Sequence, residues 1–333
     1  MARKLKGKSG SKGLKAALAQ HKLQDNLIQQ QKKKQLNADR QKAHVSKKTM
    51  RQAAVQKQRE ASVIPFSSDE TLLLIGEGDF SFAKSIIEQS YIKPENLIAT
   101  SYDASITELN LKYPNTFQSN YDFLVQEGVK ILFQTDATKL VRSMKISKHT
   151  PWSKIMGPEW RHKYLNNIMF NFPHTGKGIK DQDRNIRDHQ ELVFGYFDSS
   201  KQLFSLVNSH IKGTKNKHTQ GYDLEKTSKN SNPDGISPEG YGKILLTVFA
   251  GEPYDSWQIK TLAKDNRLML DKSSKFIWEN YPEYHHKRTN SEQNTTKPAH
   301  EREARTYIFK NFERKRNYRQ NKKNQENDEE QNI

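Results

Sequence analysis

Short apolar runs of strand length alternate with stretches of helical periodicity between residues 62 and 310, and this alternation restricts the fold more than any other feature. Short apolar runs bounded by polar residues or glycine are typical of strands that are buried on both faces of a parallel sheet. The expected strands are 71–75, 96–102, 129–134, 167–172 and 243–250, and the expected helices are 80–88, 105–112 and 187–207. The pattern predicts an α/β, Rossmann-like fold with a mostly parallel, doubly wound sheet and helices on both faces.

Two weaker strand candidates, Leu268–Phe276 and Arg305–Lys310, follow these strands, and we expect them to pair as an antiparallel far edge of the sheet. Lys, Ser, Asn and Gly dominate the segment between the long helix and the fifth strand, which predicts a mobile insertion. The predicted organisation is a basic arm at 1–62, a single domain at 63–310 with a mobile insertion at about 213–241 and a flexible loop at about 288–302, and a charged, disordered tail at 311–333.

The positive charge is concentrated at the N-terminus. The formal net charge is +18, and residues 1–62 hold 17 Lys and Arg against 3 Asp and Glu, which is +14 of that total. This segment has no Phe, Tyr or Trp, so we expect a disordered or transiently helical arm that contacts nucleic acid or directs the chain to the nucleus or nucleolus. A solubilising tail is the alternative.

Several classes of protein are excluded by composition. The chain has no cysteine, which rules out disulfides, thiolate metal sites and a cysteine nucleophile. We find no apolar run long enough to span a membrane and no signal peptide, so we expect a soluble, intracellular protein with no membrane partner.

A glycine turn follows the first expected strand. In "LLLIGEGDFSFAKSI" a buried strand runs into Gly76-Glu77-Gly78 and then a helix, an arrangement in which the backbone can approach a ligand near free N–H groups. Ser81 stands where a dinucleotide-binding motif has its third glycine, which disfavours NAD. The Glu77 carboxylate suits a cationic ligand better than a pyrophosphate. A purely structural turn remains the alternative.

Two further acids stand at the ends of the next strands. Asp103 closes "LIATSYDAS" and can accept hydrogen bonds from both hydroxyls of a ribose. Asp136 in "ILFQTDATKL" can accept from an adenine amino group. Each of them can instead be a helix cap. Ligands of such folds lie outside the carboxyl ends of the strands, so three successive strands ending in polar residues indicate one site.

The fourth strand ends in the tetrad Asn171-Phe172-Pro173-His174. Asn171 offers a carbonyl acceptor and an amide donor, Phe172 an apolar face, Pro173 a rigid turn and His174 a titratable group. That combination suits a planar heterocycle with a ring N–H, although an ordinary loop between a strand and a helix is the alternative. Gly176-Lys177-Gly178 does not complete a phosphate-binding P-loop, so an NTPase is disfavoured.

Basic side chains surround this candidate site. We expect Lys177, Lys180, Arg184 and Arg187 to bind RNA phosphates at its rim, with a solvated loop as the alternative. The segment "YPEYHHKRTN", 281–290, mixes aromatic rings with His286 and Arg288, as in proteins that hold unpaired RNA bases. Its two histidines have no further ligands at metal spacing, and we expect no metal site.

Taken together, "GEGDFSF", Asp103, Asp136, "MFNFPHTGKGIKDQDRNI" and the late "HHKRT" and "ARTYIFK" resemble one family, over about residues 66–310. It is the eukaryotic 25S rRNA (uridine-N3)-methyltransferase family. The resemblance implies S-adenosylmethionine as cofactor, a large-subunit rRNA uridine or a preribosomal particle as substrate, and a nucleolar location; we expect a monomer. It also implies a methyl-donor site formed by Gly76, Glu77, Gly78, Asp79, Phe80, Asp103, Asp136 and Phe172.

The same resemblance implies that Asn171, Pro173 and His174 form the catalytic loop. This loop resembles the Asn/Asp-Pro-Pro-aromatic loop of amino-methylating enzymes, but Phe172 and His174 depart from that pattern. We take His174 as the first candidate for the base that removes the imide proton and Asp183 as the second. A non-catalytic RNA-binding assembly factor and a nucleotide-dependent oxidoreductase are the rival interpretations.

Overall fold

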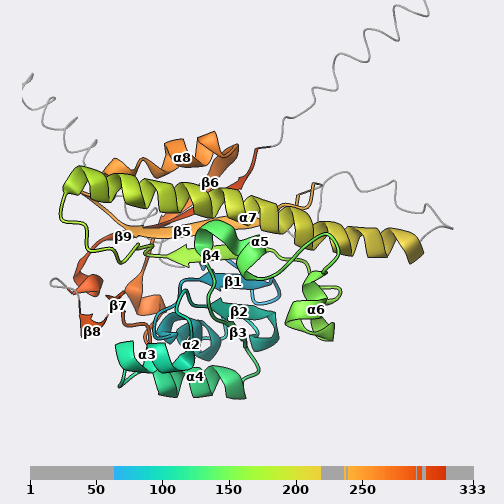
Figure 1. Ribbon diagram of the computed structural model, residues 1–333, viewed down its shortest axis with the longest axis horizontal. Helices are drawn as coiled ribbons and strands as arrows, with labels where there is room; N and C mark the ends of the chain where they lie inside the picture. Colours follow the sequence, from blue (N-terminus) through green and yellow to red (C-terminus); the bar gives the residue numbers. More distant parts are fainter. Residues whose placement is uncertain (1–63, 219–235, 238, 290, 295–297, 313–333) are drawn as a thin grey trace, which may run out of the picture. The chain divides into compact units, whose positions relative to one another are not determined.

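The computed structural model describes residues 64–218, 236–237, 239–289, 291–294 and 298–312. For residues 210–218 and 291–294 it describes the backbone only. The predicted basic arm, most of the insertion and nearly all of the tail lie outside these ranges. The described part forms a seven-stranded sheet in the order β3-β2-β1-β4-β5-β9-β6 (Figure 1). Its strands are β1 (Leu72–Ile75), β2 (Leu97–Thr100), β3 (Lys130–Leu132), β4 (Asn167–Asn171), β5 (Lys243–Phe249), β6 (Leu268–Lys275) and β9 (Ala304–Asn311).

The sheet has a parallel part and an antiparallel edge. Strands β3, β2, β1, β4 and β5 are parallel, whereas β9 is antiparallel to both β5 and β6. Both the predicted α/β class and the predicted far edge are confirmed. All four residues of β1 and all four of β2 are buried, as expected for strands covered on both faces. Edge strand β6 is mostly exposed.

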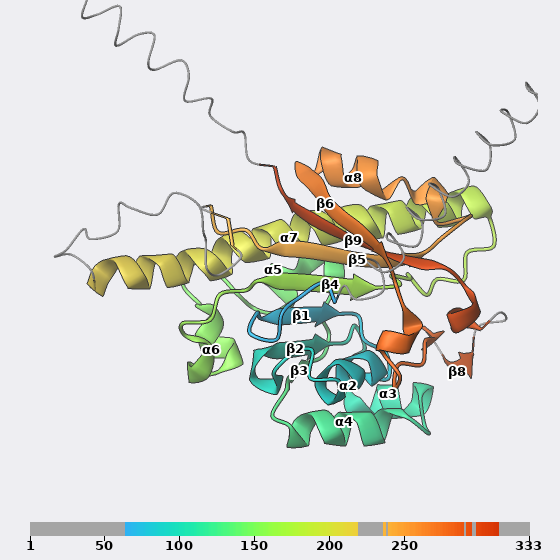
Figure 2. The ribbon, with the colours of Figure 1, turned by 180° about the vertical axis from the view of Figure 1, so that it is seen from behind.

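Helices cover both faces of the sheet (Figures 1 and 2). Helices α2, α3 and α4 lie on one face, and α5, α6, α7 and α8 lie on the other. The α-helices are α2 (Ser81–Glu88), α3 (Ile106–Lys112), α4 (Phe117–Gln126), α5 (Leu140–Ser143), α6 (Trp152–Met156), α7 (Gln182–His218) and α8 (Ile259–Asp265). The 3-10 turns are η1 (Pro94–Asn96), η2 (Ala137–Lys139), η3 (Pro158–Trp160), η4 (Asp255–Trp257), η5 (Trp278–Asn280) and η6 (Ala299–Glu301). None of the helices in the described ranges combines the length and the apolar character that a membrane crossing needs.

Each face of the sheet has its own hydrophobic core, because neighbouring side chains of a strand point to opposite faces. Leu72 and Leu74 of β1 pack under α2 and α4, while Leu73 and Ile75 pack under α5 and α7. This two-sided burial fixes the register of β1 against its neighbours, since a shift of one residue would exchange the two faces.

Helix α7 is fixed to the sheet by buried polar groups. Asn208, with 0% of its surface exposed, accepts a hydrogen bond from the backbone N–H of Leu165 (2.9 Å). Its amide donates to the carbonyl oxygens of Leu165 (3.1 Å) and Gly240 (2.6 Å). The Tyr196 hydroxyl lies 3.0 Å from the carbonyl oxygen of Ile168 in β4. These contacts hold the middle of α7 against β4 and against the segment just before it.

Some boundaries differ from the sequence predictions. Helix α7 begins at Gln182 and continues to His218, so residues 213–218 of the predicted insertion are helical. Within the predicted loop 288–302, β7 (Lys287–Arg288) pairs with β8 (Ser291–Asn294) and η6 follows. Four helices were not predicted: α5 and α6 are only one turn long, and α4 and α8 each have a narrow apolar face, with α4 burying only Phe117, Asn120 and Leu124.

We predict that Asn208→Ala lowers the free energy of unfolding by at least about 1–3 kcal/mol, because it leaves buried backbone groups without partners. Chemical denaturation of the full chain measures this. Gln202→Ala, an exposed position on the same helix, is the matched control and should change stability little. Equal effects of the two substitutions would contradict the structural role assigned to Asn208.

Candidate active site

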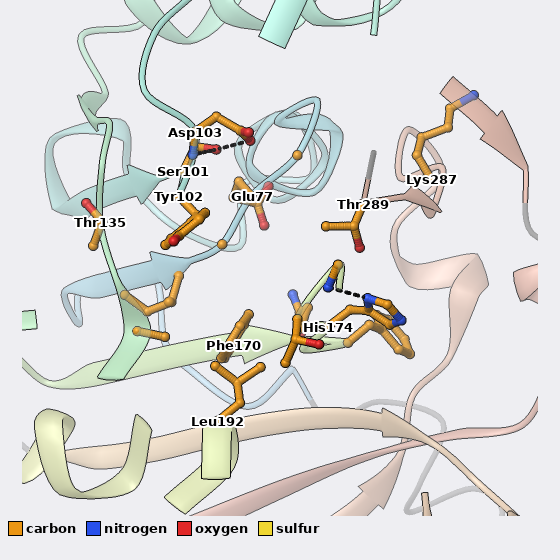
Figure 3. A pocket seen from close by; sticks show the side chains of 18 of the residues that line it. Glu77, Ser101, Tyr102, Asp103, Thr135, Phe170, His174, Leu192, Lys287 and Thr289 are labelled. Carbon is orange, nitrogen blue, oxygen red and sulfur yellow. Dashed lines mark hydrogen bonds between the residues drawn. The ribbon is translucent and has the colours of Figure 1, made fainter. Parts of the chain in front are cut away.

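A cleft with a volume of about 970 Å³ opens at the carboxyl ends of β1, β2, β3 and β4 (Figure 3). The turn containing Gly76 and the turn containing His174 both line it, although nearly a hundred residues separate them in the sequence. The predicted site residues that line the cleft are Gly76, Glu77, Gly78, Asp79, Asp103, Asp136, Asn171, Phe172, His174, Lys177 and His286.

The turn after β1 requires glycine at Gly76. Its φ of +69° is a left-handed conformation, and an added Cβ would lie 2.7 Å from the ring of Phe170 in β4. An added Cβ at Gly78 would lie 3.0 Å from the hydroxyl oxygen of Tyr113. The two glycines therefore let the backbone pass close to β4 at Gly76 and close to Tyr113, after α3, at Gly78, and this turn forms one wall of the cleft.

Glu77 is a buried carboxyl group beside this cleft, with 8% of its surface exposed. Burial raises its pKa to about 8, the nearby charge of Asp79 acts in the same direction, and the Ala83 N–H partly offsets both. That N–H donates to Oε2 at 3.3 Å. A carboxyl group kept protonated by burial becomes ionised readily when a cation lies against it. This supports the preference for a cationic ligand predicted from the sequence.

Asp79 and Phe80 have structural roles. Asp79 accepts hydrogen bonds from the Ser81 N–H (3.1 Å) and hydroxyl (2.7 Å) and from the Thr116 hydroxyl (3.0 Å), so it caps α2 although it lines the cleft. Phe80 is fully buried against Phe117 and does not line the cleft. The structure therefore does not bring Phe80 to the predicted methyl-donor site.

Asp103 lies at the end of β2, where the sequence places it. The Ser101 hydroxyl donates to it (3.1 Å), and Lys112 forms a salt bridge with it while also contacting Glu108 (2.9 Å). A ribose bound here would share the Asp103 carboxylate with Lys112. The neighbouring Tyr102 ring is 72% exposed and lines the cleft, so it is free to stack on a flat ligand.

Asp136 caps a helical turn, which was the alternative predicted for it, and it also lines the cleft. Its Oδ1 accepts from the N–H (2.8 Å) and the hydroxyl (2.7 Å) of Thr138, which caps η2. Its Oδ2 lies 4.0 Å from Lys139 Nζ. Because the cap uses Oδ1, Oδ2 can accept a hydrogen bond from a ligand at the end of β3.

Asn171 has the least satisfied side chain in the cleft. Both its Oδ1 and its Nδ2 are buried, and neither makes a hydrogen bond within the described residues. Buried amide groups normally have partners, and an unpaired one costs stability. An amide held at the last position of β4 with both polar atoms unpaired fits a ligand that offers an acceptor and a donor.

Within the tetrad, the side chains of Phe172 and Pro173 are buried in the protein. Phe172 has φ +48°, and this left-handed backbone turns its ring into an aromatic cluster with Phe249 (centroids 4.5 Å apart), His286 (4.8 Å) and Trp278 (5.5 Å). Those contacts occupy the ring, although Phe172 also lines the cleft. Pro173 is buried and is absent from the lining.

His174 turns its ring along the cleft wall (Figure 3). Its Nδ1 accepts a hydrogen bond from the Gly176 backbone N–H (2.9 Å). The ring packs edge-on against His189, with centroids 4.9 Å apart. Desolvation lowers the pKa of His174, His189 acts in the same direction, and Asp188 opposes them. The imidazole is therefore neutral at neutral pH.

Asp188 is a lining residue that the sequence analysis missed. It forms a salt bridge with Lys177, and its Oδ2 is buried with no hydrogen bond within the described residues. Desolvation raises its pKa, but the hydrogen bond and the charge of Lys177, together with the nearby polar side chain of Thr175, outweigh this and hold the pKa below its usual value. The predicted helix 187–207 already placed Asp188 and Leu192 on one face, since they are four residues apart, but its periodicity did not show that this face lines the cleft.

Asp183, the second predicted base, lies elsewhere on α7. It is exposed in the first turn and does not line the cleft. Five residues separate it from Asp188, which corresponds to a rotation of about 140° around the helix axis. The structure therefore does not bring Asp183 to the site.

The predicted RNA-binding residues fall into two groups. Lys177 lines the cleft, whereas the others of the polar run, Lys180, Arg184 and Arg187, are exposed outside its lining. His286 lines the cleft, but burial lowers its pKa to about 4, so it is neutral and cannot pair with a phosphate. Arg288 is in β7 and outside the lining, and its neighbour Lys287 is the basic residue that faces the cleft.

The segment that follows η5 closes the cleft opposite α7. The Tyr113 hydroxyl lies 3.0 Å from the carbonyl oxygen of Arg288, to which it can donate. The backbone N–H of His285 donates to the Ser81 hydroxyl (3.4 Å) at the start of α2. Tyr284 and Thr289 line the cleft. No group of three or more potential metal ligands occurs in the described part of the chain.

Solved structures of methyltransferases are similar to this chain, at low sequence identity and low TM-score. A 30S ribosomal A1408 methyltransferase from an uncultured bacterium is 9% identical, with a TM-score of 0.32 and coverage of 74% of this chain and 89% of that one. A ribosomal protein L11 methylase from Lactobacillus delbrueckii subsp. bulgaricus is 10% identical, with a TM-score of 0.32 and coverage of 80% and 79%.

The parallel sheet with its glycine turn and strand-end acids defines the class as a Rossmann-like methyltransferase. Residues 73–288 match the family described as rRNA (uridine-N3-)-methyltransferase BTM5-like, and the chain belongs to that family. A Saccharomyces cerevisiae protein named 25S rRNA (uridine(2634)-N(3))-methyltransferase is 55% identical over 318 residues, with 94% of each chain covered. Heavy metal-associated isoprenylated plant protein 41 from Arabidopsis thaliana is 28% identical over 69% of this chain and 35% of its own length. The resemblance inferred from the sequence is confirmed.

We predict that Glu77→Gln stabilises the fold, and increasingly so as the pH rises from about 4.5 to about 8. The ordinary pKa of 4.5 applies to the unfolded chain and the raised value to the folded one, so the unfolded state holds fewer protons in this window and rising pH favours unfolding of the wild type. Denaturation at a series of pH values measures the difference. Glu88→Gln, exposed at the other end of α2, is the control. Parallel pH curves for wild type and Glu77→Gln would contradict the burial effect.

Proposed function

We propose that the chain transfers a methyl group from S-adenosylmethionine to N3 of a uridine in large-subunit ribosomal RNA during ribosome biogenesis. The family match and the 55% identity to the yeast 25S rRNA enzyme support this activity. That relative is named for uridine 2634, and we propose the corresponding uridine as the target here. The observation that carries the proposal is the convergence of the Gly76 turn and the Asn171–His174 turn on one cleft.

The residues present fit the methyl donor. When bound, S-adenosylmethionine supplies a methyl group on a positively charged sulfur. The buried carboxyl group of Glu77 fits that positive charge, since it lies beside the cleft without a basic partner in the described residues. Asp103 fits the ribose hydroxyls, and Tyr102 with Asp136 fits the adenine ring and its amino group. The glycine turn leaves room for close approach of the backbone.

The opposite side of the cleft fits the edge of a uracil. This edge presents a carbonyl oxygen, the N3–H group and a second carbonyl oxygen. Asn171 offers an unpaired amide and His174 a neutral imidazole within the same turn. Holding the base and the methyl group in line can supply about 7–11 kcal/mol of the barrier reduction. The role of these residues is therefore first to position the reacting nitrogen.

We propose that basic residues at the edge of the cleft and outside it contact the RNA strand. Lys180, Arg184, Arg187 and Lys287 support a path for phosphates along its rim. The +14 charge of residues 1–62 supports contact of the arm with rRNA in a preribosomal particle and a nucleolar location. We propose that the active form is a monomer.

Direct detection of the product tests the proposal. We expect the purified chain with S-adenosylmethionine to convert a uridine of large-subunit rRNA, free or in preribosomal particles, to 3-methyluridine, detected by nucleoside mass spectrometry. Asn171→Ala should lower the rate about 10²–10³-fold, as for loss of one preorganised hydrogen-bond donor. Asn110→Ala, a surface asparagine in α3, is the control. If the methyl donor binds but no methylated uridine forms in either substrate, a non-catalytic assembly factor is favoured; binding of nicotinamide cofactors instead would favour an oxidoreductase.

Binding of the methyl donor should depend on pH through Glu77. A cation beside this carboxyl group favours its ionised form, so binding expels a proton below the raised pKa of about 8. Affinity should then increase up to about tenfold between about pH 7 and about pH 9. Calorimetric titration in two buffers of different ionisation enthalpy measures the expelled proton. Glu77→Gln should bind more weakly with no proton release; an equal release would refute the assignment.

A further inference from the structure

Methylation at N3 requires that the imide proton leaves and that the charge developing on the uracil oxygens is stabilised. We propose that Asp188 of α7 accepts the N3 proton and that His174 acts as a hydrogen-bond donor to a uracil oxygen through Nε2–H. This assignment rests on the proposed function and replaces the roles that the sequence suggested for His174 and Asp183.

The tautomer of His174 follows from one hydrogen bond. A backbone N–H can only donate, and that of Gly176 donates to Nδ1 of His174 at 2.9 Å. Nδ1 therefore carries a lone pair, and the proton of the neutral ring is on Nε2. In this state Nε2 is a donor. To remove a proton from uracil, the ring would first have to break its bond to Gly176.

His189 holds His174 in place and cannot replace it as the base. Its Nδ1–H donates to the carbonyl oxygen of Asn185 (2.8 Å), and its ring stacks on Trp257 with centroids 4.7 Å apart. Only 1% of its surface is exposed, and it does not line the cleft. His189 thus acts as a positioning residue behind the His174 ring.

Most of the other carboxyl groups that line the cleft are occupied. Asp79 caps α2, Asp136 caps η2 at the far end of the site, and Asp103 and Glu108 share Lys112. Glu77 lies in the turn after β1, on the side of the methyl donor. Apart from these five residues, two carboxylates line the cleft. Both are on α7, on the side of the tetrad.

Those two are Asp188 and Glu191. Asp188 has a buried, unpartnered oxygen, and its charge acts on the ring of His174. Lys177, Thr175, His174 and His189 are the polar groups that face it. Glu191 is exposed, and no hydrogen bond or ion pair holds its carboxylate within the described residues. A fixed carboxylate beside the ring that contacts the base is the better acceptor, because general-base catalysis needs a defined position.

The step balances within these groups. The N3–C bond forms as the bond between sulfur and the methyl carbon breaks, and sulfur keeps that electron pair and becomes neutral. The electron pair of the N3–H bond stays on nitrogen, and the proton passes to Oδ2 of Asp188. His174 Nε2–H and the amide of Asn171 donate to the uracil oxygens while negative charge develops there. A weakly basic carboxylate suffices, because N3 becomes more acidic as the new bond forms.

Substitution of Asp188 tests the proton acceptor in the rRNA methylation assay. We expect Asp188→Asn to lower kcat about 10²–10⁴-fold with little change in the affinity for S-adenosylmethionine. Its residual rate should rise tenfold per pH unit towards the pKa of the uracil imide, because ionisation in solution must then replace the acceptor. Asp188→Glu should recover part of the loss. Asp183→Asn on the same helix is the matched control and should leave the rate unchanged.

Two further variants separate this role from its alternatives. If Asp188 served only to hold Lys177, then Lys177→Met would reproduce the loss of Asp188→Asn without the new pH dependence, and that result would overturn the proposal. The proposal would also be overturned if Glu191→Gln, rather than Asp188→Asn, produced the loss of rate and the new pH dependence. A wild-type enzyme that forms no 3-methyluridine would reject the proposed function, whereas an active wild type with an unaffected Asp188→Asn variant would reject only this inference.

The tautomer of His174 has a readout that does not need catalysis. Nitrogen NMR of ¹⁵N-histidine-labelled protein, assigned with His174→Ala, should show a protonated Nε2 and an unprotonated Nδ1 at neutral pH, with and without S-adenosylmethionine. In the assay, His174→Gln should recover much of the rate that His174→Ala loses, since glutamine keeps a donor and cannot titrate. A protonated Nδ1, or an acidic limb of the pH–rate profile that disappears in His174→Gln, would restore His174 as the base.

Discussion

The parallel pairing of β1 with β4 is the constraint on which the site depends. Their register sets Ile75 opposite Phe170, so that Gly76, the first residue after β1, lies beside Asn171, the last residue of β4. Both strands are buried on both faces, and a slip of one residue would place every side chain in the wrong core. The hydrophobic cores therefore determine the distance between the turn that fits the methyl donor and the turn that fits the base.

The sequence was informative wherever a local pattern determined the result. The apolar runs of β1, β2, β4 and β5 predicted a parallel sheet, and glycine at Gly76 predicted a turn that only glycine can make. The strand-end acids Asp103 and Asp136 were predicted to share a site, because the carboxyl ends of parallel strands meet at one edge.

The remaining parts depend on tertiary contacts that no local pattern shows. Phe80 follows the glycine turn, yet its left-handed backbone directs the ring into the core. Asp183 and Asp188 look alike in sequence, and only the packing of α7 on the sheet decides which of them faces the cleft. The pairing of Tyr113 with the backbone of Arg288 joins segments 175 residues apart, and side-chain periodicity contains no information about it.

Strand order has a consequence for how the chain is made. The last strand of the described residues, β9, is inserted between β5 and β6, both of which precede it in the sequence. Until residues 304–311 have left the ribosome, β5 and β6 have no partner on the sides where β9 will lie. During synthesis the apolar strand β5 therefore waits with an unpaired edge, which is a period of exposure to aggregation and to chaperones. The strand that joins the parallel part of the sheet to its antiparallel edge is thus the latest of the described strands to be made.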